Sequence, residues 1–177
     1  MIPEVLPLFE EGNFAEIAAP VIFRPGKASQ TERFKRYTSA GEKSIFRKHS
    51  SIVDQLEVFL GPAYSILAGN MSVEMTRFHG NIADIVTRDP KGAFAIYEVK
   101  THIKARKNIR EAIAQLLDYA AHGGDMVIRS LIIVSPAALS PSDSQFLEKL
   151  KSVIEYPVSY LQYIESADGG NGQFILC

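Results

Sequence analysis

The sequence predicts an α/β protein in which a mixed β-sheet is flanked by helices on both faces. Two observations predict this class. The expected elements follow one another as helix, three strands, helix, strand, helix and strand, an order typical of a layered domain of sheet and helices. In addition, the run Met126–Ser135 is apolar at both alternating sets of positions, as in a strand that helices cover on each side.

Length and composition indicate a single compact domain. The chain has 177 residues, of which 46% are hydrophobic and 22% are charged, and this excludes a disordered protein. Its apolar runs fall far short of the ~20 residues that cross a bilayer, so we expect no membrane association. Cys177 is the only cysteine, which excludes an internal disulfide and a zinc module and favours a cytoplasmic setting. We expect residues 1–40 to form an N-terminal cap or arm on a domain spanning 41–177.

The N-terminal half begins with weakly patterned sequence. A short helix is expected near Asn13–Ala18 and a strand at Val21–Arg24, with Pro25-Gly26 as a turn. The first strong pattern is a helix at Glu42–Leu60, where apolar residues recur at helical spacing and Gly61-Pro62 ends the run.

Three strands are predicted next. They are Ser72–Phe78, Asn81–Thr87 and Ala93–Thr101, and each is rich in β-branched or aromatic residues. The segment Asp89-Pro90-Lys91-Gly92 has the composition of a tight turn, so the last two strands should pair as a hairpin.

Helices and strands alternate in the C-terminal half. The predicted elements are a helix at Ala105–His122, a strand at Met126–Ser135, a helix over Ser140–Ile154, a strand at Val158–Ile164 and an edge strand at Gln173–Leu176. Gly123-Gly124 ends the first of these helices, and Ser140-Pro141 supplies a cap and a first-turn proline for the second.

Two carboxylates lie where a strand should be apolar. Asp84 shares a strand face with Ile82 and Val86, and Glu98 shares one with Phe94 and Ile96. An unpaired buried charge costs several kcal/mol, and the predicted hairpin brings the two acids close enough to repel each other. A divalent cation between them resolves both problems, and carboxylate oxygens suit Mg²⁺ or Mn²⁺.

Lys100 follows Glu98 on the same face of its strand and should enter the same pocket. Its ammonium can orient a water molecule or stabilise charge that develops on a phosphate. Together with Asp84 and Glu98, it forms a candidate site for metal-assisted hydrolysis of phosphodiester bonds. The structural alternative is a buried network of these three side chains without a metal.

The combination of Asp84, the triplet Glu98-Val99-Lys100 and the helix segment 110–119 resembles the PD-(D/E)XK nuclease superfamily, which has the restriction-endonuclease-like fold. The resemblance covers about residues 42–135. It implies that Asp84 and Glu98 hold the metal, that the carbonyl of Val99 is a further ligand, and that Gln115 lies near the substrate or the active site. The chain departs from the family pattern at Ala83, where proline is common.

Members of this superfamily often add one more acid to the metal site. Glu42, Glu57 and Glu74 are the candidates here, and we favour Glu74 or Glu57. His49 falls within the apolar stripe of the first helix. It is either a buried structural histidine or a residue that touches the scissile phosphate or a metal-bound water.

Basic residues are concentrated in two segments. Residues 24–48 and 100–110 hold 13 of the 19 lysines and arginines in a chain whose net charge is −1. Such clusters can bind phosphates, although solvated helix faces would produce the same pattern. The candidates for contacts with nucleic acid are Lys104, Arg106, Lys107 and Arg110 at the cleft, and Arg33, Lys35 and Arg36 on a basic and aromatic arm.

We therefore expect a Mg²⁺- or Mn²⁺-dependent endonuclease that hydrolyses DNA, with His49 and Gln115 assisting Asp84, Glu98 and Lys100. Small nucleases often need two active sites to cut the two strands of a duplex, and a homodimer would provide them. The alternative is a catalytically inactive module on the same fold that binds nucleic acid or protein.

Overall fold

The computed structural model describes residues 21–29, 42–167 and 170–177, with backbone only for 42–46. Its main sheet has seven strands, and neighbouring strands in the following list are hydrogen-bonded. In spatial order they are β1 (Gly26–Lys27), β2 (Met71–Val73), β5 (Ile85–Arg88), β6 (Phe94–Val99), β7 (Ile128–Ser135), β8 (Val158–Ile164) and β9 (Gln173–Leu176). The sheet is mixed, because β6, β7 and β8 run parallel whereas the β2–β5, β5–β6 and β8–β9 pairs are antiparallel.

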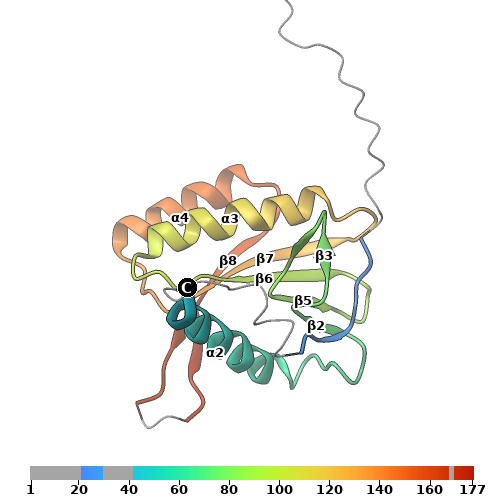
Figure 1. Ribbon diagram of the computed structural model, residues 1–177. Coiled ribbons are helices and arrows are strands. Elements are labelled where there is room, and N and C mark those ends of the chain that lie inside the picture. The colour runs from blue at the N-terminus through green and yellow to red at the C-terminus, as the bar shows by residue number, and fades with distance from the viewer. Residues whose placement is uncertain (1–20, 30–41, 168–169) are drawn as a thin grey trace, which may run out of the picture.

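Three described helices cover the two faces of this sheet. Helix α2 (Glu42–Leu60) lies on one face, and α3 (Ala105–Ala121) and α4 (Pro141–Val153) lie together on the other (Figure 1). Strand β7 contributes to both cores: Leu131 packs on the α3 side and Ile132 on the α2 side. This confirms the mixed α/β class. No helix in the described ranges is long and apolar enough to span a bilayer.

Most predicted elements occur where the pattern placed them. The bounds of α2, β8 and β9 match the prediction, and α3, β7 and α4 differ by one or two residues at their ends. The capping prediction for α4 is confirmed, because the Ser140 hydroxyl accepts a hydrogen bond from the Asp143 backbone N–H. The short helix expected at Asn13–Ala18 and most of the predicted arm over residues 1–40 lie outside the described ranges.

The prediction for Val21–Gly26 was wrong. Residues 21–25 form no strand, and Gly26, which was expected in a turn with Pro25, instead begins β1 and pairs in parallel with β2. The backbone N–H of Arg24 donates to the side-chain oxygen of Thr76 at 3.2 Å. Only after Pro25, which has no N–H to donate, does the chain reach the sheet edge.

Two strands predicted as continuous are each divided in two. Residues 72–78 become β2 and β3 (Arg77–Phe78), and residues 81–87 become β4 (Asn81–Ile82) and β5. Strands β3 and β4 form a separate two-stranded sheet, joined by a turn in which His79 and Gly80 both have positive φ. The break after β2 occurs at Glu74, whose φ of 54° turns the chain away from the ladder. Glu74 and Asp84 lie at the two breaks.

Candidate active site

An open cleft of about 830 Å³ lies at the C-terminal end of β6. Helix α2 contributes His49 to it, and the breaks in the strands contribute Glu74 and Asp84. The end of β6 and the loop that follows contribute residues 98–103, and one side of α3 closes the cleft. The cleft therefore gathers segments that are far apart in the sequence.

The cleft holds three buried carboxylates, on Glu74, Asp84 and Glu98. Strand β5 pairs with β6 so that Ile85 lies opposite Tyr97, and the same register, continued by one residue, sets Asp84 opposite Glu98. Glu74 joins them because its backbone N–H donates to the carbonyl of Asp84 at 2.8 Å. The hairpin prediction for these two acids therefore agrees with the observed register.

Asp84 is held as a charged carboxylate. Its Oδ2 accepts a hydrogen bond of 2.7 Å from the backbone N–H of Val99 and lies 3.1 Å from Nε2 of His49. Burial alone would raise the pKa of Asp84, but the positive charge of His49 and the hydrogen bonds from both residues outweigh burial and lower it. The same interaction raises the pKa of His49 against the opposing effect of burial.

Glu98, in contrast to Asp84, favours its protonated form. Burial, and next the negative charge of Asp84, raise the pKa of Glu98 to about 8, although Lys100 counteracts them. The ammonium of Lys100 donates to Oε1 of Glu98 at 2.8 Å, while Oε2 is buried without a hydrogen-bond partner among the described residues. Without a further cation, this carboxyl therefore retains a proton near neutral pH.

The described side chains offer a donor set that fits a divalent cation. Ligand atoms of His49, Glu74 and Asp84 lie within 4.8 Å of one another, and each residue offers one. Glu98 and Val99 line the same cleft, and the unpartnered Oε2 of Glu98 is a further oxygen donor. Carboxylate and carbonyl oxygens suit Mg²⁺ and Mn²⁺, and an imidazole nitrogen is compatible with Mn²⁺.

Only one of the two favoured candidates for an additional metal-binding acid lies at the cleft. Glu74 is 3% exposed and lines the cleft. Glu57 is not part of the cleft lining, and its Oε2 accepts a hydrogen bond of 2.6 Å from Nζ of Lys27. The side chain of Glu42 lies outside the described set. Of the two favoured residues, only Glu74 is placed to join Asp84.

The structure agrees with the interpretation of His49 as a structural histidine, and its contact with a phosphate or a metal-bound water stays a prediction. Its side chain is 13% exposed and hydrogen-bonded, as expected of a structural histidine, yet it also lines the cleft. On the other side of the cleft, Gln115 is exposed to it from α3. Tyr119, one turn further along α3, is buried, and its hydroxyl donates to the carbonyl of Ile82 at 3.1 Å.

Of the basic residues predicted to contact nucleic acid, some lie at the cleft and others do not. Lys107 lines the cleft, whereas Lys104 is exposed at the N-cap of α3 and is not part of the lining. Arg110 is exposed as well, with its guanidinium 5.8 Å from the ring centre of Phe146. Arg33, Lys35 and Arg36 lie outside the described residues, so their role stays a prediction.

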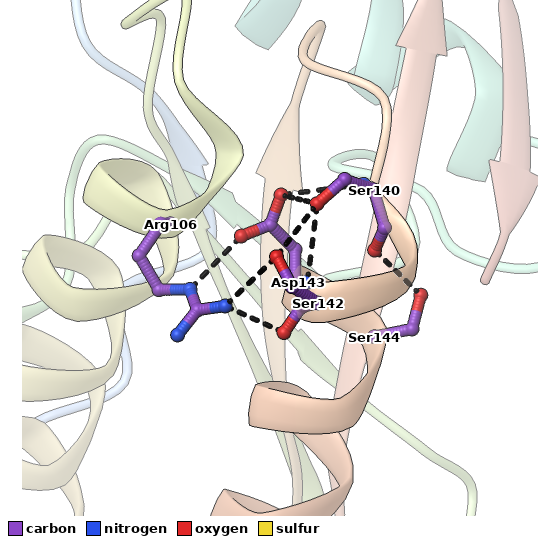
Figure 2. Close-up of polar contacts among 5 residues, drawn as sticks. All are labelled: Arg106, Ser140, Ser142, Asp143 and Ser144. Atoms are coloured by element: carbon purple, nitrogen blue, oxygen red, sulfur yellow. Dashed lines mark hydrogen bonds and ion pairs between the residues drawn. The ribbon is translucent and has the colours of Figure 1, made fainter.

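Arg106 is engaged by α4. Its Nε lies 2.9 Å from Oδ1 of Asp143, its guanidinium donates to the carbonyl of Ser142, and it stacks 4.2 Å above the ring of Phe146. Figure 2 shows this side chain pointing toward the first turn of α4, where Ser140 and Asp143 cap each other. Arg106 therefore joins two helices and does not line the cleft.

One wall of the cleft was not anticipated from the sequence. The β3–β4 hairpin places Arg77, Asn81 and Ile82 along it, and a hydrogen bond of 3.2 Å from Asn81 to Asp118 ties the hairpin to α3. The dipeptide His79-Gly80 between two short runs is a two-residue turn pattern that could have indicated this hairpin.

Comparison with known proteins gives no assignment. No protein-family model matches the chain, and no curated protein matches it. The geometry of the cleft is therefore the basis on which a function can be inferred.

Proposed function

We propose that this protein is a metal-dependent endonuclease that hydrolyses phosphodiester bonds in DNA. The observation that carries the proposal is the meeting of Asp84, Glu98 and Lys100 in one cleft open to solvent. The cleft has a volume of about 830 Å³, which is room for a phosphate and water beside the three side chains.

Asp84, Glu98, Glu74 and the carbonyl of Val99 would hold a Mg²⁺ or Mn²⁺ ion, with His49 beside them. When bound, the cation supplies a Lewis acid that activates water and neutralises charge on the phosphate. The raised pKa of Glu98 supports this assignment, because a carboxyl that takes up a proton to reduce repulsion can exchange that proton for a metal.

Lys100 has the geometry of a positioning group. Its side chain is 20% exposed. Its ammonium donates to Glu98 and has two further protons to direct toward a water or a phosphate oxygen. Asp84 keeps the nearby backbone in register by accepting the N–H of Val99. Lys107 and the exposed Lys104 would hold the DNA backbone near the cleft by charge, which makes binding dependent on salt.

The test is a cleavage assay on supercoiled and linear DNA. We expect cutting with Mg²⁺ or Mn²⁺, none with chelator, and none by the Lys100→Ala variant, whose circular dichroism stays that of the wild type. Lys149→Ala removes an exposed lysine of α4 that does not line the cleft, and this control should cut normally. Wild-type cutting by Lys100→Ala would end the proposed mechanism.

A second candidate is an inactive binding module, because Lys100 already donates to Glu98 at 2.8 Å and this contact needs no metal. Calorimetric titration with Mn²⁺ separates the two candidates: binding that Asp84→Ala abolishes supports the nuclease, and DNA binding without Mn²⁺ binding supports the module. A homodimer would supply one cleft for each strand of a duplex, and sedimentation of the DNA-bound protein tests for it.

A further inference from the structure

Ile103 is an apolar side chain at an unusual place. It lines the cleft, yet 87% of its surface is exposed to solvent. It lies in the short loop between Lys100 and the start of α3 at residue 105, close in sequence to the proposed catalytic lysine. A single exposed isoleucine needs no explanation on most surfaces, but this one lies among polar and charged residues of the cleft.

The loop that carries Ile103 is fixed by a buried amide. Asn108 is fully buried; its side chain accepts the backbone N–H of His102 at 3.0 Å and donates to the carbonyl of His102 at 2.7 Å. It also donates to the Ser135 hydroxyl on β7 at 2.7 Å. A further bond joins the backbone N–H of Lys104 to Nδ1 of His102. The residues on both sides of Ile103 are thus held in place, and Ile103 projects outward.

Two exposed lysines lie close to Ile103 in the sequence, of which Lys107 also lies 3.7 Å from Oε1 of Glu111. Lys104 is next to Ile103 and exposed, and Lys107 lines the cleft one turn along α3. The first turn of α3 contains no acidic residue to balance the positive end of the helix dipole. Nucleic acid has a negatively charged backbone around a stack of apolar base faces. It therefore complements an exposed isoleucine that has lysines beside it.

We propose that Ile103 is a wedge that enters the base stack of duplex DNA beside the scissile phosphate. This inference rests on the proposed function and adds that the duplex is locally unstacked when bound. Apolar side chains inserted at a base step separate the bases and kink the helix, and a tip whose flanking residues are fixed loses little conformational entropy on insertion. Unstacking next to Lys100 would open the backbone toward the metal site.

The experiment uses duplexes in which 2-aminopurine occupies successive positions, bound to the full-length protein with Ca²⁺ in place of Mg²⁺. We expect a rise in 2-aminopurine fluorescence at one or two adjacent positions with the wild type. Ile103→Ser should lose this rise and retain wild-type circular dichroism, and Ile103→Leu should keep it. Leu67→Ser is the matched control, because Leu67 is 99% exposed but does not line the cleft.

Equal fluorescence with wild type and Ile103→Ser, or binding without any fluorescence change, overturns the wedge. So does a failure of the wild type to bind duplex DNA, the result expected if a protein partner covers Ile103. The cleavage assay distinguishes these failures from failure of the proposed function: metal-dependent cutting without unstacking removes the wedge and leaves the nuclease. Unstacking without cutting removes the nuclease and leaves a DNA-binding wedge.

Discussion

The carboxylate of Asp84 accepts the backbone N–H of Val99 at 2.7 Å, across the gap between the start of β5 and the end of β6. This bond ties the first acid of the cleft to the centre of the Glu98-Val99-Lys100 segment. It uses one lone pair of Oδ2 and leaves Oδ1 for another partner. The geometry of the candidate site is therefore set by the main chain as well as by the side chains that would react.

Replacing Asp84 with Asn tests whether its charge holds the metal. Asp84→Asn keeps the size of the side chain and an oxygen for the Val99 N–H, so the fold should persist. The loss of a negative ligand should weaken Mn²⁺ binding by at least about tenfold, measured by calorimetry. Asp125→Asn, at an exposed position away from the cleft, serves as the control and should bind as the wild type does. Unchanged affinity in Asp84→Asn would contradict the assignment.

Glu74 and Glu57 offer a direct comparison of a cleft acid with a surface acid. Glu74→Gln should reduce Mn²⁺ affinity because Glu74 lies with His49 and Asp84. Glu57→Gln should leave Mn²⁺ affinity unchanged and cost less than about 1 kcal/mol of stability, since it removes only a partly exposed pair with Lys27. The reverse ranking in calorimetry would transfer the metal role to Glu57.

The stability of the metal-free protein should fall as pH rises. Glu98 binds a proton more tightly when folded, with a pKa of about 8 against an ordinary 4.5, so between these values the folded state holds more protons than the unfolded state. His49 acts in the same direction, because its pKa is raised: the stability from its ion pair with Asp84 is complete below pH 6.5 and is lost as pH rises through the raised pKa.

Urea denaturation in chelator from pH 5 to pH 9 measures this slope. Glu98→Gln should flatten the slope without removing the part due to His49. Stability that increases over this window in the wild type would contradict the protonation states assigned to the cleft.

Asn108 should contribute strongly to stability. Asn108→Ala removes three hydrogen bonds at a fully buried position and leaves groups of the 102–104 loop unsatisfied, so we expect a loss of about 2–3 kcal/mol. Asn81→Ala removes one exposed bond to Asp118 and should cost less than about 1 kcal/mol. Urea denaturation at fixed pH compares them, and equal losses would show that the amide does not fix the loop.

Arg106 and Lys107 are adjacent basic residues with different expected roles. Lys107→Ala should weaken DNA binding and reduce the slope of log affinity against log salt by about 0.9, the value for one phosphate contact. Arg106→Ala should lower the urea midpoint, because Arg106 joins α3 to Asp143 and Phe146, and should leave the salt slope unchanged. A reduced salt slope in Arg106→Ala would show that this side chain leaves α4 to bind DNA.

Local sequence patterns were sufficient to predict those parts of the site whose geometry is set within a single hairpin. The turn at residues 89–92 fixes the register of the β5–β6 hairpin, and that register alone sets Asp84 opposite Glu98. Strand alternation puts Lys100 on the same side as Glu98, and the observed bond between them agrees. These relations involve residues within one hairpin, so periodicity and turn composition suffice to predict them.

Only the tertiary structure decided which other residues join the hairpin. His49 and Asp84 are 35 positions apart in the sequence and are brought together by the packing of α2 on the sheet. The left-handed backbone at Glu74 arises where β2 leaves the ladder. Arg106 and Lys107 differ by one position on a helix, yet one faces α4 and the other the cleft. Sequence spacing predicts which side chains share a face of a helix or strand. Which element packs against that face depends on contacts between segments distant in the sequence, and no local pattern encodes those contacts.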